Sequence, residues 1–219
     1  MTAKPNFSNA YSKANEMLVK STIISNFPFS ALDLVKEQSD IKCRTFNKAL
    51  SYGVDISSFG SESAVLVHYN GKSIIFYDDE KPMNHVQFSI LHELGHSINN
   101  HDLSIKDSET YGKYEVETNY FAAQLLMPEQ ILREFQKRGN RITRQFLQEH
   151  FKVSYHAADK RITTLAKTNV EWRSRSESEY DDIILFKYKT FLDTISPIQN
   201  VYSFEDEYSL ELERNTWVL

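Results

Sequence analysis

The residues best suited to chemistry lie in the stretch FSILHELGHSINNH, residues 88–101, which contains the pattern HExxH. Residues four apart share one face of an α-helix, so His92 and His96 can offer two imidazoles to one metal ion. Glu93 follows His92 directly and would activate a water molecule on that metal. The apolar residues that would bury the rest of the helix are Phe88, Ile90, Leu91, Leu94 and Ile98. The stretch therefore predicts a zinc hydrolase built around a buried helix.

Two histidines leave such a site incomplete, because a hydrolytic zinc site usually has three protein ligands and one open position. The metzincin pattern HExxHxxGxxH does not fit, since Asn99 stands at its glycine position and Asp102 at its last histidine position. His101 is the nearest further histidine. We expect it to end the helix, where an imidazolium suits the helix dipole.

A better third ligand lies in KYEVETNYFAAQLLMP, residues 113–128, which has helical apolar spacing and is ended by Pro128. Glu115 and Asn119 are four apart and share a face. Glu115 would complete a His2Glu site, and Asn119 would hydrogen-bond a histidine ligand from one turn further on. Glu117 is the alternative ligand, although it points about 200° around the helix from Glu115.

The two motifs in this order, FSILHELGH and EVETNYFAAQLLMP, strongly resemble those of the ImmA/IrrE family of zinc metallopeptidases, which are gluzincin-like. The resemblance covers about residues 8–168. It implies that His92, His96 and Glu115 bind Zn2+ and that Glu93 is the catalytic residue. Thr118 departs from the alanine that is usual in the family, and we expect it to lie off the ligand face.

The resemblance implies an α+β fold of the zincin-like metallopeptidase type, with a small β-sheet, an HExxH helix and a following ligand helix. It also implies a zinc metalloendopeptidase that acts on an intracellular protein, typically a transcriptional repressor of a mobile element or prophage. Two alternatives remain open. One is a non-catalytic regulator that keeps the zincin fold and binds a repressor or DNA, and the other is a toxin of a two-component system.

The elements before the HExxH helix follow from local patterns. Helices are predicted at 9–24 and 30–37, the second capped by Ser30, and a strand at 41–46. Strands at 64–69 and 72–77 flank Asn70-Gly71, a pair that fits a type I′ hairpin turn. Asn84 is the expected cap of the HExxH helix. A hairpin directly upstream of that helix suggests that substrate binds as an added strand.

The rest of the chain is divided by composition. We assign residues 1–137 to the metallopeptidase domain, 138–168 to a helix-turn-helix-like segment, and 169–219 to a linker (171–180) and an accessory region. The second segment is locally basic, which permits a DNA-reading role, but a structural helix pair with solvated faces is the favoured interpretation. Its basic residues are Arg138, Arg141, Arg144, Lys152, Lys160, Arg161 and Lys167.

Composition excludes several classes of protein. The net charge of −5 gives no electrostatic case for nucleic-acid binding by the whole chain. The single cysteine, Cys43, excludes a thiolate zinc cluster, and we expect it to be a small buried strand residue. No apolar run approaches a membrane span and no signal peptide is evident, which predicts a cytoplasmic protein. The sequence leaves the oligomeric state and the oxyanion-stabilising residue open; Tyr111, Tyr114, Tyr120 and His101 all lie near the motifs.

Overall fold

The sheet is built on the hairpin that the sequence predicts. In the computed structural model, which describes residues 4–59, 63–105, 108–168 and 175–198, strands β2 (Ala64–Tyr69) and β3 (Lys72–Tyr77) pair antiparallel. Asn70 and Gly71 between them have φ angles of 48° and 74°, and a type I′ turn requires positive φ at both. Strand β1 (Ile41–Thr45) pairs in parallel with β3. The strand order β1-β3-β2 leaves β2 at an edge.

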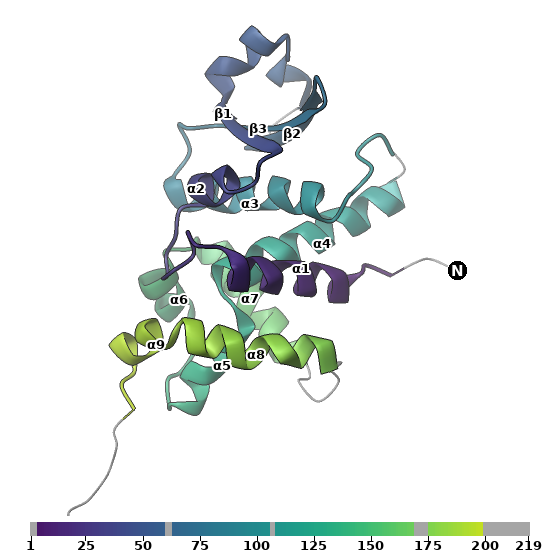
Figure 1. Cartoon of the computed structure of the whole chain (residues 1–219). Helices are drawn as coiled ribbons and strands as arrows, with labels where there is room; N and C mark the ends of the chain where they lie inside the picture. Colours follow the sequence, from purple (N-terminus) through teal and green to yellow (C-terminus); the bar gives the residue numbers. More distant parts are fainter. Residues whose placement is uncertain (1–3, 60–62, 106–107, 169–174, 199–219) are drawn as a thin grey trace, which may run out of the picture.

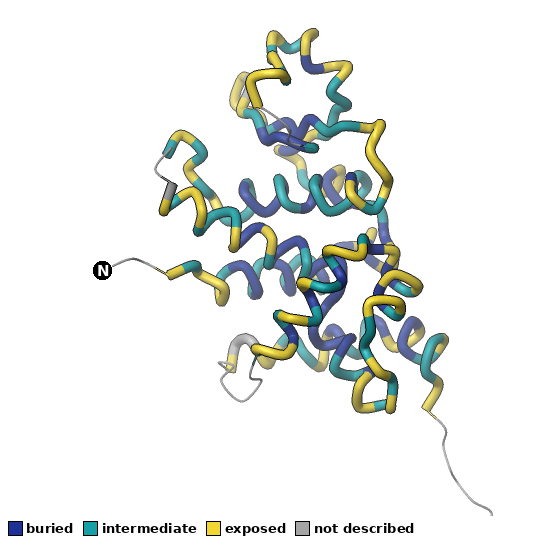
Figure 2. Tube along the Cα trace, turned by 180° about the vertical axis from the view of Figure 1, so that it is seen from behind, coloured by how far each residue is buried: buried dark blue, intermediate teal, exposed yellow. Residues whose placement is uncertain are grey.

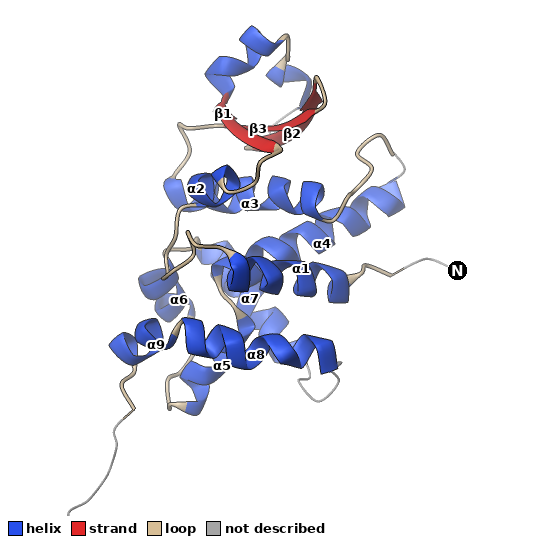
Figure 3. Cartoon of the chain, viewed as in Figure 1, coloured by secondary structure: helices blue, strands red, loops and turns tan. Residues whose placement is uncertain are grey.

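The two faces of this sheet belong to different cores, because successive side chains point to opposite sides of a strand. Leu66 and Ile75 join the main core, on the side covered by α2 (Ala31–Lys36) and α3 (Met83–Ile98). On the other face a small cluster lies under the 3-10 turns η1 (Phe46–Tyr52) and η2 (Ile56–Phe59). Its buried members are Ala49, Val65, Ile74 and Phe76. Figure 3 shows the sheet between these turns and the helices.

The remaining helices stack below the sheet in layers. Figure 1 shows α3 beneath the sheet, then α4, then α1, then α8, and each neighbouring pair is in contact. Their buried sides form the main core, drawn dark blue in Figure 2. The helices not yet placed are α1 (Phe7–Lys20), α4 (Ser108–Leu126), α5 (Glu129–Lys137), α6 (Arg144–Phe151), α7 (Tyr155–Lys167), α8 (Arg175–Lys187) and α9 (Lys189–Ile195). The protein is therefore a mostly helical α+β structure with a small mixed sheet.

Local signals placed some helix ends correctly and others not. The Ser30 side chain accepts a hydrogen bond from the backbone N–H of Asp33, as predicted for a cap of α2. The predicted cap of α3 was wrong: that helix begins at Met83, and Pro82 occupies the cap position with no side-chain hydrogen bond. Pro82 lies outside the helix, with ψ of 137°, and its carbonyl accepts the backbone N–H groups of His85 and Val86.

The second ligand helix begins before its apolar motif. Residues 108–111, which are polar, form the first turn of α4. Glu109 lies in that turn, where a carboxylate suits the helix dipole, and it forms an ion pair with Lys113 one turn on. These favourable terms start the helix before its apolar spacing begins.

The end of the described chain is more ordered than a linker. Residues 175–180, expected in a linker, begin α8. The Lys187 ammonium donates to the carbonyls of Leu18 and Ser21 at the end of α1, and the Tyr188 hydroxyl donates to Leu18 and Ile24. The division into residues 1–137, 138–168 and 169–219 stays a prediction, and the acidic stretch from 204 lies outside the described residues. No helix within the described ranges is both long enough and apolar enough to cross a membrane.

Candidate metal centre

Helix α3 presents its two motif histidines from one buried face. His92 and His96 are one turn apart, and Ile90, Leu91 and Leu94 on the same helix are fully buried. His96 is 3% exposed and His92, at the open side, has a side chain that is 14% exposed. The packing of α3 thus fixes both imidazoles and leaves one side of the pair accessible.

Gly95 lets helix α4 approach this face closely. A Cβ atom at Gly95 would lie 3.0 Å from the ring of Phe121 and 3.3 Å from the side chain of Thr118, both on α4. Carbon atoms in ordinary contact are about 3.5–4.0 Å apart, so a larger residue would not fit without movement. The group that packs against Gly95 is therefore the side-chain layer of α4.

The close approach brings Glu115 of α4 against the two histidines. The ligand atoms of these three residues all lie within 4.8 Å of one another. His92 Nε2 and His96 Nε2 are 3.2 Å apart, and each lies 3.3 Å from an oxygen of Glu115. Zinc–nitrogen and zinc–oxygen bonds of about 2.0–2.1 Å at tetrahedral angles would place ligand atoms about 3.3 Å apart. The two imidazoles lie near different oxygens of Glu115, Oε2 and Oε1, and the three side chains are close enough to hold one metal ion between them.

The electrostatics of the group suit a cation. Burial raises the pKa of Glu115, but hydrogen bonds with His92 and His96 outweigh it and hold that pKa well below the usual range. Burial lowers the pKa of His92, and the neighbouring Glu115 and Glu93 more than offset this, leaving it raised. The negative carboxylate of Glu115 thus favours positive charge on the neighbouring imidazoles, and a divalent metal would supply positive charge at the same place.

The other predicted site residues lie around this triad. Asn119 Oδ1 lies 3.1 Å from His92 Nδ1, at the ring nitrogen that does not face Glu115. Glu93 points to the sheet, where its Oε2 accepts a hydrogen bond of 2.9 Å from the backbone N–H of Leu66 in edge strand β2. Thr118 does not lie off the ligand face as expected, because its hydroxyl oxygen is 3.3 Å from both ring nitrogens of His92.

Glu117, the alternative ligand, points away from the triad. Its Oε2 is 2.9 Å from His101 Nε2, and its Oε1 accepts a 2.6 Å hydrogen bond from the backbone N–H of Asn6. His101 Nδ1 lies 3.1 Å from His96 Nδ1. The expectation of an imidazolium at His101 was wrong, because burial, only partly offset by Glu117, lowers its pKa. Its backbone N–H does bind the carbonyl of His96 just past the end of α3.

Sequence reasoning missed this His96–His101–Glu117 contact. The only signal was the second glutamate of EVETN together with a histidine five residues after His96. Two of the residues considered for stabilising the oxyanion have ring contacts within the fold. Tyr114 stacks on the ring of His101, and Tyr120 packs against Phe7. Tyr111 is 42% exposed and lies one turn before Glu115.

Titratable residues outside the group are engaged in structural contacts. His68 Nδ1 is 3.1 Å from the hydroxyl of its cross-strand neighbour Ser73, and His85 Nε2 is 2.7 Å from Ser63 Oγ. Burial raises the pKa of the Cys43 thiol to about 12. A thiol in that state is a poor nucleophile at neutral pH.

The basic segment has fewer solvated charges than its composition suggests. Arg138 pairs with Glu134 and Asp193, and Arg144 pairs with Asp159. Arg161 is 2% exposed and donates to the carbonyl of Met127 and to Gln124 Oε1. Of the seven basic residues, Arg138 thus joins the end of α5 to α9, Arg144 joins α6 to α7, and Arg161 joins α7 to the end of α4.

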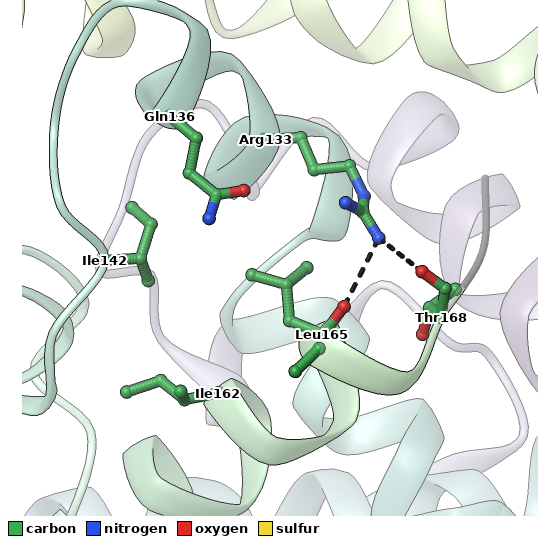
Figure 4. Close-up of a pocket in the computed structure, with 7 residues that line it drawn as sticks. Arg133, Gln136, Ile142, Ile162, Leu165 and Thr168 are labelled. Atoms are coloured by element: carbon green, nitrogen blue, oxygen red, sulfur yellow. Dashed lines mark hydrogen bonds between the residues drawn. The ribbon is translucent and has the colours of Figure 1, made fainter.

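A separate cavity of about 300 Å³ lies between α5 and α7. Figure 4 shows Arg133 at its rim, donating to the carbonyls of Leu165 and Thr168 at the end of α7. Ile142 and Ile162 form part of its apolar wall. None of the predicted site residues lines this cavity, and the Arg133 side chain caps the end of α7.

Comparison with known proteins agrees with this geometry. Residues 49–163 match the model of a peptidase family, the IrrE N-terminal-like domain. The match covers 115 of 219 residues, just over half of the chain, and includes both ligand helices. No curated protein matches the chain significantly.

Proposed function

The chain belongs to the ImmA/IrrE family of metallopeptidases, and from this premise we propose that it is a zinc-dependent endopeptidase of zincin-like fold. His92, His96 and Glu115 would hold the metal, and Asn119 would orient the ring of His92. The observation that carries the proposal is the convergence of the two Nε2 atoms, 3.2 Å apart, on the Glu115 carboxylate, which places one of its oxygens 3.3 Å from each of them. Bound zinc would lower the pKa of a coordinated water towards neutrality and polarise the scissile carbonyl.

Glu93 would act as the general base and then as the general acid. It precedes Leu94 on the ligand helix and directs its carboxylate towards β2, so it lies between the ligand pair and the sheet edge. Its carboxylate would take the proton of the attacking water and deliver it to the leaving amine. A glutamine at this position keeps the shape and the hydrogen bond to Leu66 but cannot carry that proton.

The substrate would be an extended polypeptide bound along β2. In a hairpin with a two-residue turn the pair next to the turn is hydrogen-bonded, and bonding then alternates along the strands. By this register Val65 and Val67 bond to β3, whereas Ala64, Leu66 and His68 direct their backbone groups to the open side. A substrate carbonyl that accepted the Leu66 N–H would release Glu93 for catalysis.

The family resemblance supports an intracellular protein as substrate, such as the transcriptional repressor of a mobile element or prophage. We also propose that the protein is cytoplasmic and that it does not bind nucleic acid directly. The engaged arginines of the 138–168 segment support the second point, because Arg138, Arg144 and Arg161 are held by internal partners. Retention of Glu93 favours catalysis over a purely scaffolding role, which needs the ligands but not the base.

Elemental analysis of zinc in the wild type and three variants tests the metal assignment. We expect about one zinc per chain in the wild type and in Glu93→Gln, and little in Glu115→Ala, because only the last loses a ligand. Glu117→Ala removes no ligand and should retain more zinc than Glu115→Ala. Zinc loss from Glu117→Ala but not from Glu115→Ala would reverse the choice of carboxylate.

Peptidase activity is tested with the zinc-loaded proteins and an unfolded protein substrate. New amino termini, counted by mass spectrometry, should form with the wild type and fall by at least about 100-fold with Glu93→Gln, the range expected for loss of a general base. Equal cleavage by both proteins would exclude Glu93 as the base. A wild type that binds zinc yet cleaves no protein, including repressors tried as substrates, would favour the regulator alternative.

A further inference from the structure

The two histidine ligands are supported in different ways. His92 Nδ1 faces an amide oxygen, that of Asn119, at 3.1 Å. His96 Nδ1 instead faces a second imidazole, that of His101, also at 3.1 Å. His101 is in turn 2.9 Å from a carboxylate, Glu117 Oε2. His96, the more deeply buried of the two, is thus the first member of a hydrogen-bonded chain that continues through His101 to Glu117.

The hydrogens along this chain can be arranged in only one way when His96 binds a metal. Nε2 of His96 faces Glu115, so it is the nitrogen that would bind the metal, and the hydrogen of the neutral ring must then be on Nδ1. That N–H donates to His101 Nδ1, which therefore carries its own hydrogen on Nε2. The Nε2–H donates to Glu117, whose other oxygen accepts the backbone N–H of Asn6. Every member is satisfied only when His101 is neutral.

The chain is held rigidly at both ends. The His101 side chain is 3% exposed and stacks on Tyr114, with ring centroids 4.1 Å apart and planes 11° apart. Asn6 caps helix α1 with its side chain, and Asn9 in the first turn of that helix bonds to Asn99 at the end of α3. The chain therefore connects three helices at the buried side of the metal centre.

We propose that His101 and Glu117 are positioning residues that fix the tautomer and the ring orientation of His96 as a metal ligand. The inference rests on the proposed zinc site and adds to it two residues that contact neither metal nor substrate. Partners of this kind typically contribute 10- to 100-fold, roughly, to metal affinity. An apolar residue of similar shape at position 101 would remove the partner of His96, and one at position 117 would remove the partner of His101.

Two substitutions at His101 separate bonding from packing. His101→Phe keeps an aromatic ring against Tyr114 but has neither acceptor nor donor. His101→Gln loses the ring, yet its Oε1 can accept from His96 and its amide N–H can donate to Glu117. We expect zinc affinity, measured by competition with a chelator, to fall about 10- to 100-fold in the phenylalanine variant and to recover in the glutamine variant.

Glu117→Gln is the second variant and keeps His101 in place. It retains one acceptor oxygen for two donors, so we expect weaker zinc binding than in the wild type. This variant decides the test if His101→Phe does not fold, which far-UV circular dichroism of the metal-free protein will show. Unchanged affinity in Glu117→Gln would then overturn the proposal.

Three outcomes are distinguishable. Equal zinc affinity in wild type and a folded His101→Phe overturns the positioning role while the zinc site stands. Equally weak binding in the glutamine and phenylalanine variants also overturns it, because restored bonds would have had no effect. Absence of zinc from the wild type itself refutes the proposed function, and the positioning role with it.

Discussion

Gly95→Ala is the substitution that most directly probes how the two ligand helices are spaced. Gly95 lies between His92 and His96 in sequence, on α3, and faces Phe121 and Thr118 on α4. A methyl group there would meet the Phe121 ring at 3.0 Å, and that ring is fully buried. The helices would have to separate by about 0.5 Å to restore ordinary carbon–carbon contact.

The expected cost follows from two opposing terms. Alanine is favoured over glycine in a helix interior by about 1 kcal/mol. Overpacking a well-packed core costs about 1–3 kcal/mol. The metal-free Gly95→Ala protein should therefore lose about 0–2 kcal/mol of unfolding free energy. Zinc ligand distances tolerate only about 0.2 Å, so zinc should also bind at least tenfold more weakly, or about 1.4 kcal/mol.

Gly112→Ala in α4 is the matched control, because nothing lies within 4 Å of a Cβ atom there. It should stabilise the protein by up to about 1 kcal/mol through helix propensity alone. Urea unfolding of both metal-free variants, followed by chelator competition for zinc, measures the two effects. If Gly95→Ala is as stabilising as Gly112→Ala and keeps wild-type zinc affinity, the glycine contact does not set the helix spacing.

Two further predictions concern stability away from the metal. The pKa of Glu37 is lowered, because hydrogen bonds from Ser21 and Thr22 outweigh the opposing effect of burial. A depressed carboxylate pKa stabilises the fold above the unfolded-state value near 4.5 and loses this contribution as pH falls through the folded-state value. Glu37→Gln should thus destabilise the metal-free protein by less than about 1 kcal/mol at neutral pH. The difference in unfolding free energy between this variant and the wild type should vanish on acid titration. A difference that persists at low pH would contradict the prediction. Arg161→Met leaves two buried acceptors at the end of α4 without their donor and should lower the free energy of urea unfolding by about 1–3 kcal/mol. Arg144→Gln, which removes an exposed ion pair, should lower it by less than about 1 kcal/mol. Equal losses in the two variants would show that the buried hydrogen bonds contribute nothing extra.

The parts that the sequence predicted have local causes. The spacing of His92 and His96 needs only the helical period, and the β2–β3 hairpin needs only Asn70 and Gly71. Glu115 was preferred to Glu117 because it shares a helix face with Asn119 and matches the glutamate of the family motif, and the structure places it beside the two histidines. Such features depend on residues a few positions apart, so one sequence suffices to find them.

The parts that were missed depend on contacts between distant segments. The bond of Asn6 to Glu117 spans 111 positions, and nothing near either residue indicates the other. Residues 175–180 look like a linker because they are charged and serine-rich, whereas Ile184 in α8 and Tyr188 just after it are buried and anchor the helix. Packing of a few apolar residues thus outweighed local composition.

The hydrogen bond between Glu93 and Leu66 has a consequence for self-association. An edge strand offers unpaired backbone groups to any other chain, and proteins often discourage such pairing with a charge placed at the edge. In the described part of the chain, β2 is such an edge, and the Glu93 carboxylate covers one of its outward donors. Removing the carboxylate with Glu93→Ala would therefore leave a strand edge more prone to pair with another chain, in addition to removing the proposed general base. Glu93→Gln keeps an acceptor for the Leu66 N–H, so it is the safer of the two variants for concentrated samples.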